Sequence, residues 1–232
     1  GDVGHTLVAG PTGMGKSVLL ATMAIQFRRY RGSRIFAFDM GRSIRAAILG
    51  MGGEHYDLGA DDEIAFQPLA RIDREGYRTW ASEWVEGRLL HEGAAVGPDE
   101  KAAIWSALGS LASAPVEQRT LTGLTALLQS NTLRQALAPY VLGGAHGRLL
   151  DADHDRLGTA DVQAFEMEEL MHSKAAVLAV LRYLFARFEE RLDGAPTLLI
   201  LDEAWLFLDD PVFAARIRQW LKTLRKKNVS VI

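Results

Sequence analysis

Residues 10–17 read Gly-Pro-Thr-Gly-Met-Gly-Lys-Ser, and this stretch decides the fold. It fits the pattern G-x-x-x-x-G-K-[S/T], in which backbone N–H groups of a glycine-rich loop surround a phosphate chain. The context fits as well. The short apolar run His5–Ala9 precedes the loop as an expected strand, and apolar residues at helical spacing follow it from Lys16 to Arg29. A phosphate-binding loop between a strand and a helix predicts an α/β fold.

Each position of this loop has an expected role in binding a nucleotide. The glycines let the backbone curl around the phosphates, and the helix that starts near Lys16 directs the positive end of its dipole at them. Lys16 is expected to contact the β- and γ-phosphates, and the Ser17 hydroxyl to complete the shell of a Mg²⁺ ion. The predicted cofactors are therefore ATP and Mg²⁺. The expected binding residues are Gly10, Pro11, Thr12, Gly13, Met14, Gly15, Lys16, Ser17 and Val18.

A second motif, Leu-Leu-Ile-Leu-Asp-Glu at residues 198–203, supplies the acidic groups that such a site needs. The continuous apolar run Thr197–Leu201 predicts a central parallel strand buried on both faces, which brings Asp202 to the carboxyl edge of the sheet beside the loop. Asp202 is expected to hold a water of the Mg²⁺ shell, and Glu203 to orient and polarise the attacking water. Acidic residues at a strand end often only cap a helix. Their combination with the glycine loop favours the catalytic interpretation.

The rest of the chain consists of two flanks of alternating strands and helices around a helical middle. From about residue 74 to 140 only helical patterns occur, whereas alternation elsewhere predicts a mostly parallel sheet. We therefore expect an ATPase core in residues 1–70 and 161–232, incomplete at its C-terminal end, with a mainly helical insertion in 71–160. Further strands are expected at Arg34–Phe38, His55–Leu58, Val162–Met167 and Asn228–Ile232. Further helices are expected at Ser43–Met51 and Ser173–Leu192, and from Pro211 with Asp210 as N-cap.

Composition narrows the class of protein. The 232 residues are 48% hydrophobic, include no cysteine and carry a net charge of −3 from 26 basic and 29 acidic residues. The lack of cysteine excludes disulfides and thiolate metal sites. This charge is untypical of a domain that mainly grips nucleic acid, so DNA contact is not indicated. No apolar run approaches the roughly 18 residues of a membrane span. The chain begins at Gly1 without a methionine and ends at Ile232 within an expected strand, so we expect a piece of a longer protein.

Four stretches together resemble one family: GHTLVAGPTGMGKS at 4–17, RIFAFDMGRS at 34–43, TLLILDEAWLFL at 197–208 and LKTLRKKNVSVI at 221–232. They resemble the RecA-like branch of P-loop ATPases. Within it, they are similar to the large ATPases of type IV secretion and conjugative transfer systems, of the TrbE kind. The resemblance is weaker across residues 71–160. Gln67 stands where the family-like segment would have asparagine, so that segment is assigned no role.

The resemblance implies a RecA-like fold and an ATPase that energises pilus assembly and substrate transfer at the cytoplasmic face of the bacterial inner membrane. The implied partners are further copies of the chain, as a homo-hexamer or, in isolation, a dimer or monomer, and other secretion-system components. Related hexameric motors pump DNA, so a DNA-translocating ATPase remains an alternative. A scaffold whose assembly is switched by nucleotide is a second alternative, although the intact acidic and loop motifs speak against it.

The resemblance also implies a catalytic role for Arg225. In related motors the arginine at the matching helix end reaches across a subunit boundary to the neighbour's nucleotide; the alternative is a basic residue favoured there by the helix dipole. Two further residues carry open alternatives. Asp39 either touches the nucleotide or caps the next turn, and capping is favoured. Arg148 is a loop arginine that either approaches a neighbouring subunit's nucleotide or has no such role.

Overall fold

The computed structural model describes residues 4–11, 13–60, 63–203 and 211–232. The chain divides into two compact units that are each discontinuous in sequence. The first unit comprises residues 1–61, 158–172 and 186–232, and the second comprises 62–157 and 173–185. Within the described residues, no helix has both the length and the apolar character needed to cross a bilayer.

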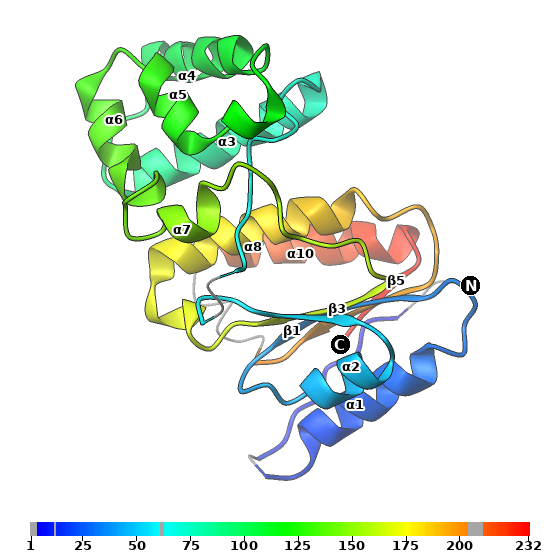
Figure 1. Ribbon diagram of the computed structural model, residues 1–232. Coiled ribbons are helices and arrows are strands. Elements are labelled where there is room, and N and C mark those ends of the chain that lie inside the picture. The colour runs from blue at the N-terminus through cyan, green and yellow to red at the C-terminus, as the bar shows by residue number, and fades with distance from the viewer. Residues whose placement is uncertain (1–3, 12, 61–62, 204–210) are drawn as a thin grey trace. The chain divides into compact units, whose positions relative to one another are not determined.

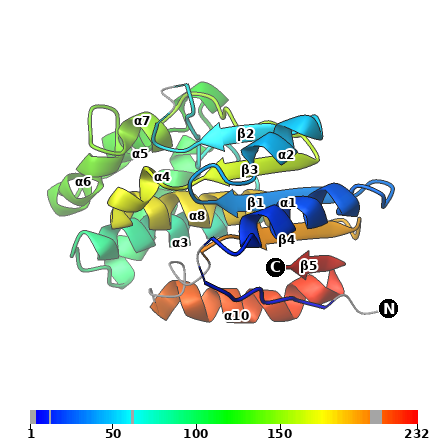
Figure 2. The same ribbon diagram turned by 90° about the horizontal axis from the view of Figure 1, so that it is seen from below.

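The first unit is built on a five-stranded sheet whose strands lie in the order β2-β3-β1-β4-β5 (Figure 2). All four strand pairs are parallel, which confirms the predicted α/β architecture. The register places Ala37 of the central strand between Ala164 and Ile200. The strands are β1 Arg34–Asp39, β2 Glu54–Asp57, β3 Val162–Glu166, β4 Thr197–Leu201 and β5 Val229–Val231.

Helices cover both faces of this sheet, as buried parallel strands require (Figure 1). On one face lie α1 (Lys16–Phe27) and α2 (Arg45–Gly50), which pack against alternate strand residues. That core contains Leu20, Ala24, Ile35, Ala37, Ile44, Ile48, Val162, Ala164, Leu198 and Ile200. On the other face lie α10 (Pro211–Lys226) and the last turn of α8 (Lys174–Glu189). The apolar strands are therefore buried on two sides.

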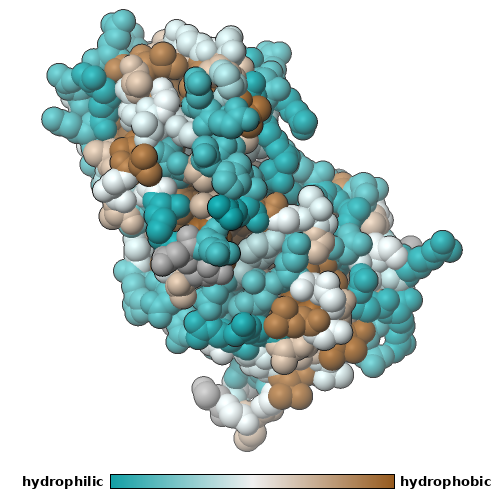
Figure 3. Space-filling model, viewed as in Figure 1, coloured by the Kyte–Doolittle hydropathy of each residue, from teal (hydrophilic) through white to brown (hydrophobic). Residues whose placement is uncertain are grey.

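Aromatic rings form the second core layer. The Phe36 ring of β1 meets Phe188 of α8 edge-on, with centroids 4.7 Å apart, and Phe188 meets Trp220 of α10 at 5.2 Å. The layer formed by α1 and α2 also has apolar residues on its outer surface. Figure 3 shows hydrophobic side chains (brown) gathered over these two helices. Leu19, Ile25 and Leu49 are among the exposed ones. α1 therefore has apolar residues on both its buried and its exposed side.

The strand expected at His5–Ala9 is wrong, because the structure assigns no strand among the described residues 4–11. This segment runs beside β5 and makes one backbone hydrogen bond to it, from Thr6 N to Val231 O at 2.8 Å. A ladder needs successive backbone hydrogen bonds, but Val231 N donates to the ring Nδ1 of His5 at 3.2 Å and not to a backbone carbonyl of this segment. Leu7 consequently remains 89% exposed, although its apolar neighbours gave the segment a strand-like pattern.

The second unit is helical, as the pattern over residues 74–140 predicted. Its helices are α3 Glu75–His91, α4 Pro98–Leu111, η1 Val116–Gln118, α5 Leu121–Leu127, α6 Asn131–Leu137, η2 Ala138–Tyr140 and α7 Gly147–Leu150, with the first part of α8. α4 begins at Pro98, and Glu100 accepts a hydrogen bond from Gly97 N at 2.9 Å. The buried tryptophan Trp84 donates its Nε1–H to Ala179 O at 3.0 Å. The short helix α7 includes Arg148, which was expected to lie in a loop.

Candidate nucleotide-binding site

The glycine-rich loop leads into α1 through backbone conformations that favour glycine. Gly13 has φ 82° and Gly15 has φ 78°, both in the left-handed region where a side chain is strained. A Cβ at either position would meet no atom within 4 Å, so the requirement comes from the backbone and not from crowding. α1 then begins directly at Lys16, as predicted. The first turn of a helix leaves N–H groups without intrahelical acceptors, and here they border the loop.

Lys16 folds back over the loop that precedes it. Its Nζ donates hydrogen bonds to the carbonyl oxygens of Gly10 at 2.9 Å and Pro11 at 3.0 Å. Carbonyl oxygens hold the ammonium group without neutralising it, so its charge remains for an anion. A helix N-terminus and an adjacent ammonium group together fit a phosphate chain. Ser17 lies in the same first turn, Met14 and Val18 are exposed, and Thr12 lies outside the described residues.

Asp202 follows the carboxyl end of β4, next to β1. Its backbone N–H donates to Phe38 O at 2.9 Å, its Oδ1 accepts from Glu203 N at 3.1 Å, and its Oδ2 lies 3.4 Å from Ser43 Oγ. The pKa of Asp202 is raised, chiefly by burial and also by the charge of the Glu203 carboxylate. The hydrogen bonds from Glu203 N and Ser43 and the charge of Lys16 act in the opposite direction and lower it. Lys16 and Asp202 are therefore within electrostatic reach of each other. The structure thus brings together the two motifs that sequence reasoning predicted as one site.

Glu203 occupies an unusual backbone position. It is exposed and has φ 51°, in the left-handed region that non-glycine residues rarely adopt. Such outliers persist where the surrounding structure enforces them, and they are frequent at functional sites. No sequence pattern signalled this conformation, because Glu203 was singled out for its carboxylate alone.

Asp39, at the end of β1, caps the turn that follows it, which confirms the favoured interpretation. The side chain is 1% exposed and accepts hydrogen bonds from Ser43 Oγ at 2.6 Å and Ile44 N at 3.0 Å. The pKa of Asp39 is raised, chiefly by burial and also by the nearby charges of Glu166 and Asp202. The two hydrogen bonds lower it, but by less. Asp39 therefore belongs to the surroundings of Asp202, through Ser43.

Glu166, at the end of β3, is a site residue that sequence reasoning missed. Its carboxylate is fully buried and accepts from the backbone N–H groups of Gly41 at 3.1 Å and Glu168 at 2.9 Å, and also from Arg42 N. The ligand-type atoms of Asp39, His55 and Glu166 lie within 4.8 Å of one another. Both carboxylates are engaged by the chain following β1, so they organise that loop. The signal that the sequence offered for this role was an acidic residue at the end of an expected strand, in Phe165-Glu166.

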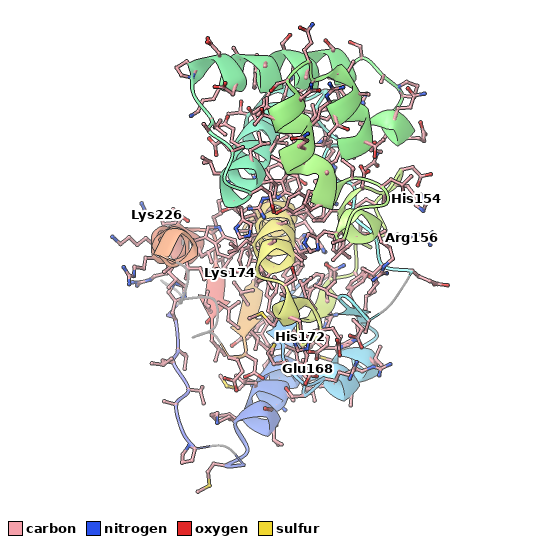
Figure 4. The ribbon with its side chains drawn as sticks, turned by 90° about the vertical axis from the view of Figure 1, so that its left-hand side faces the viewer. His154, Arg156, Glu168, His172, Lys174 and Lys226 are labelled. Carbon is pink, nitrogen blue, oxygen red and sulfur yellow. The ribbon has the colours of Figure 1, made fainter. Side chains whose placement is uncertain are left out.

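Arg225 does not join the other predicted residues. It is exposed and lies in the last turn of α10, which leads into the amino end of β5. The amino ends of β4 and β5 meet there, because Thr197 N donates to Asn228 O at 3.1 Å. In Figure 4, the neighbouring Lys226 is labelled on α10, across the sheet from α1. The structure therefore separates Arg225 from the glycine loop of its own chain.

A parallel sheet flanked by helices, with a glycine-rich loop before α1 and an acidic pair after β4, defines the class of P-loop nucleotide-binding folds. The solved structure of VirB4 from Thermoanaerobacter pseudethanolicus has the same fold, with a TM-score of 0.72 at 20% identity. The match covers 99% of this chain and 67% of that one. The predicted RecA-like α/β fold is thereby confirmed.

Sequence comparison identifies homologues of the chain, whereas no family model matches it. The chain is 45% identical to a probable conjugal transfer protein TrbE of Sinorhizobium fredii and 45% identical to the conjugal transfer protein TrbE of Rhizobium radiobacter, over its whole length. It is 29% identical to the type IV secretion system protein VirB4 of Bartonella quintana over 98% of its length. The chain is homologous to TrbE and VirB4 proteins over the region that it matches, in agreement with the resemblance. It spans only 36%, 29% and 30% of these three relatives.

Proposed function

We propose that this chain binds ATP with Mg²⁺ and hydrolyses it, and that hydrolysis energises type IV secretion or conjugative transfer. One observation carries the proposal: Lys16 is held over the glycine loop by hydrogen bonds to the carbonyl oxygens of Gly10 and Pro11, at the start of α1. A phosphate-binding cation and a metal-type carboxylate in one site are what nucleotide hydrolysis requires. The biological setting is supported by relatives named as conjugal transfer and type IV secretion proteins.

The roles of the residues follow from their chemistry. The loop Gly10–Val18 and the start of α1 bind the phosphates, and Lys16 contacts the β- and γ-phosphates. Ser17 and Asp202 hold the Mg²⁺ shell; when bound, the ion neutralises charge on the transferred phosphoryl group. Glu203 orients the attacking water and accepts its proton. The exposed position of Glu203, directly after Asp202, supports this assignment.

The assembly belongs to the same proposal. We assign the motor core to residues 1–70 and 161–232, with a helical insertion at 71–160, and we propose that several copies, as in a homo-hexamer, form the working motor. Arg225 then serves a neighbouring copy's nucleotide, which is supported by its place at the edge of the sheet away from its own Asp202. Other secretion-system components at the cytoplasmic face of the bacterial inner membrane are the expected partners.

The test is nucleotide binding and phosphate release by the purified protein, with Lys16→Ala beside Lys222→Ala. Both substitutions remove one lysine charge, but Lys222 is an exposed residue of α10 that has no role in the proposed site. We expect Lys16→Ala to lose binding and turnover, and Lys222→Ala to keep both. Equal ATPase rates in the parent and Lys16→Ala would contradict the proposal. Added DNA separates the alternatives, because a DNA-translocating motor is stimulated by it and a secretion energiser is not.

A further inference from the structure

The loop that follows β1, residues 40–44, is held in one conformation from two sides. Glu166 accepts hydrogen bonds from the backbone N–H groups of Gly41 and Arg42, and Asp39 accepts from Ile44 N. Arg42 has φ 56°, which is strained for a non-glycine residue. Two buried carboxylates therefore hold a short loop that would not adopt this shape by backbone preference alone.

Ser43 is the residue that this loop presents to the nucleotide site. Its exposed hydroxyl lies between two carboxylates, 2.6 Å from Asp39 Oδ1 and 3.4 Å from Asp202 Oδ2. A hydroxyl has a single proton, so Ser43 donates to Asp39, the nearer carboxylate, or, after rotation about its Cβ–Oγ bond, to Asp202. The weaker contact to Asp202 is then the one that changes most easily when Asp202 gains a new partner.

The strands make this arrangement rigid. β1 and β4 are hydrogen-bonded neighbours, and the pair Phe38 and Leu201 is in register just before Asp39 and Asp202. Asp202 N donates to Phe38 O at 2.9 Å, so the backbone of Asp202 is fixed against β1. What remains free in Asp202 is the rotation of its carboxylate. Glu203 N contacts one of its oxygens, and Ser43 Oγ is positioned beside the other.

We propose that Ser43 is a positioning residue for Asp202: its hydroxyl, anchored on Asp39, orients the Asp202 carboxylate toward the Mg²⁺ shell of the bound nucleotide. The inference rests on the proposed function, since it concerns the same site. It adds the loop 40–44, held by Asp39 and Glu166, to the groups that prepare this site for the metal. Ser43 itself touches neither nucleotide nor metal in this scheme and acts through Asp202.

A loop-capping role without any effect on Asp202 would give a different result. If Ser43 only satisfied Asp39, Ser43→Ala would lower stability and leave the response to Mg²⁺ unchanged. If Ser43 orients Asp202, the substitution weakens the component of nucleotide binding that depends on Mg²⁺, while binding without Mg²⁺ stays the same. The dependence on Mg²⁺ therefore distinguishes positioning from a structural role.

The experiment measures binding of a fluorescent ATP analogue by the purified protein, in EDTA and over a Mg²⁺ titration, without measuring turnover. We expect Ser43→Ala to raise the half-saturating Mg²⁺ concentration about three- to tenfold, the effect of losing one long and therefore weak hydrogen bond. Ser43→Thr keeps the hydroxyl and should restore the parent value. Ser113→Ala, an exposed serine of the second unit, is the matched control and should behave as the parent.

Each outcome has one meaning. A parent whose nucleotide binding is independent of Mg²⁺ overturns the proposed function and this inference with it. A Mg²⁺-dependent parent with an unchanged Ser43→Ala variant overturns the inference and leaves the proposed function standing. If Ser43→Ala does not fold, as judged by its thermal transition, Ser43→Cys takes its place. Cysteine is close in size but a weak donor, so the same increase is expected and its absence overturns the inference.

Discussion

Asp202 and Arg225 lie at opposite ends of the strands of the parallel sheet. Asp202 follows the carboxyl end of β4, whereas Arg225 is in the last turn of α10, directly before the amino end of β5. The five residues of β4, at about 3.3 Å each, place the carboxyl and amino ends of the strands about 17 Å apart. An arginine in this position cannot serve the nucleotide of its own chain, so any catalytic role of Arg225 must involve a neighbouring copy.

Mixing two inactive variants tests this role of Arg225. We expect Arg225→Ala to reduce ATP hydrolysis by roughly a thousandfold under assembling conditions, because a cation that stabilises transition-state charge is lost. Mixed with Glu203→Gln, it should regain some of the activity, because some interfaces then combine an intact Arg225 with an intact Glu203. Lys226→Ala is the control and should keep the parent rate. A normal rate for Arg225→Ala alone would reduce Arg225 to a residue favoured by the helix dipole.

Glu203→Gln should separate binding from chemistry. The substitution keeps the size of the side chain and removes the group that accepts a proton from water. We expect phosphate release to fall by about two orders of magnitude or more, with unchanged affinity for a fluorescent ATP analogue. Glu168→Gln, an exposed glutamate after β3, serves as the control. Parent turnover in Glu203→Gln would remove Glu203 from its assigned role.

The helical unit offers a stability test at Trp84, which is 0% exposed and donates a hydrogen bond to Ala179 O. Trp84→Phe removes the donor and leaves a small cavity beside the Ala179 carbonyl, which keeps only its partner within α8. We expect a loss of about 1–3 kcal/mol in the free energy of unfolding, measured by urea titration. Trp105→Phe is the matched control, since Trp105 is 40% exposed, and it should change stability by less than about 0.5 kcal/mol. Equal effects of the two substitutions would contradict the packing described for α3.

The ion pair between Arg34 and Asp193 predicts a dependence of stability on pH. The two side chains make two hydrogen bonds of 2.8 Å, and the Arg34 hydrogen bond lowers the pKa of Asp193 from 3.8 to about 2. Because the folded-state pKa lies below the unfolded value, the pair stabilises the fold above about pH 4, and this contribution is lost as the pH falls toward 2.

Asp193→Asn should therefore lower stability at neutral pH and reduce its decline between pH 4 and 2. The effect should be modest, because Asp193 is exposed and solvent screens the pair. Denaturant titrations at several pH values measure it, with the exposed residue Asp99 as the site of a control substitution, Asp99→Asn. Parallel pH profiles for the parent and Asp193→Asn would contradict the assignment.

The fold was predictable where a residue pattern has one structural meaning. The run Thr197–Leu201 forms β4 with the predicted bounds, and Pro98 begins α4 as its fixed φ favours. The apolar run His5–Ala9 was misleading, because strand formation depends on a partner strand that no local pattern reveals. The grouping of residues 173–185 with the helical unit was equally invisible, because α8 reads as one continuous helix.

The motifs of the candidate site were predictable from the sequence, whereas the residues that hold those motifs in place were not. Lys16 and Asp202 were expected together, because a parallel sheet brings the carboxyl ends of its strands to one edge. Ser43 and Glu166 were missed, since their contributions are hydrogen bonds between residues 125 and 159 positions apart in sequence. The left-handed backbone of Glu203 was equally inaccessible, because it arises from the turn after β4 and not from the residue type.

The order of the strands has a consequence for how the chain folds. The central strand β1 pairs with β3 and β4, whose first residues lie 128 and 163 positions beyond Arg34, at Val162 and Thr197. Closing such long loops is slow, whereas the helices between residues 75 and 150 make contacts that are local in sequence. During synthesis, β1 therefore emerges long before either partner strand exists. We expect the helical unit to acquire structure first and the sheet to close last, so the newly made chain passes through a stage in which the central strand β1 has unpaired edges.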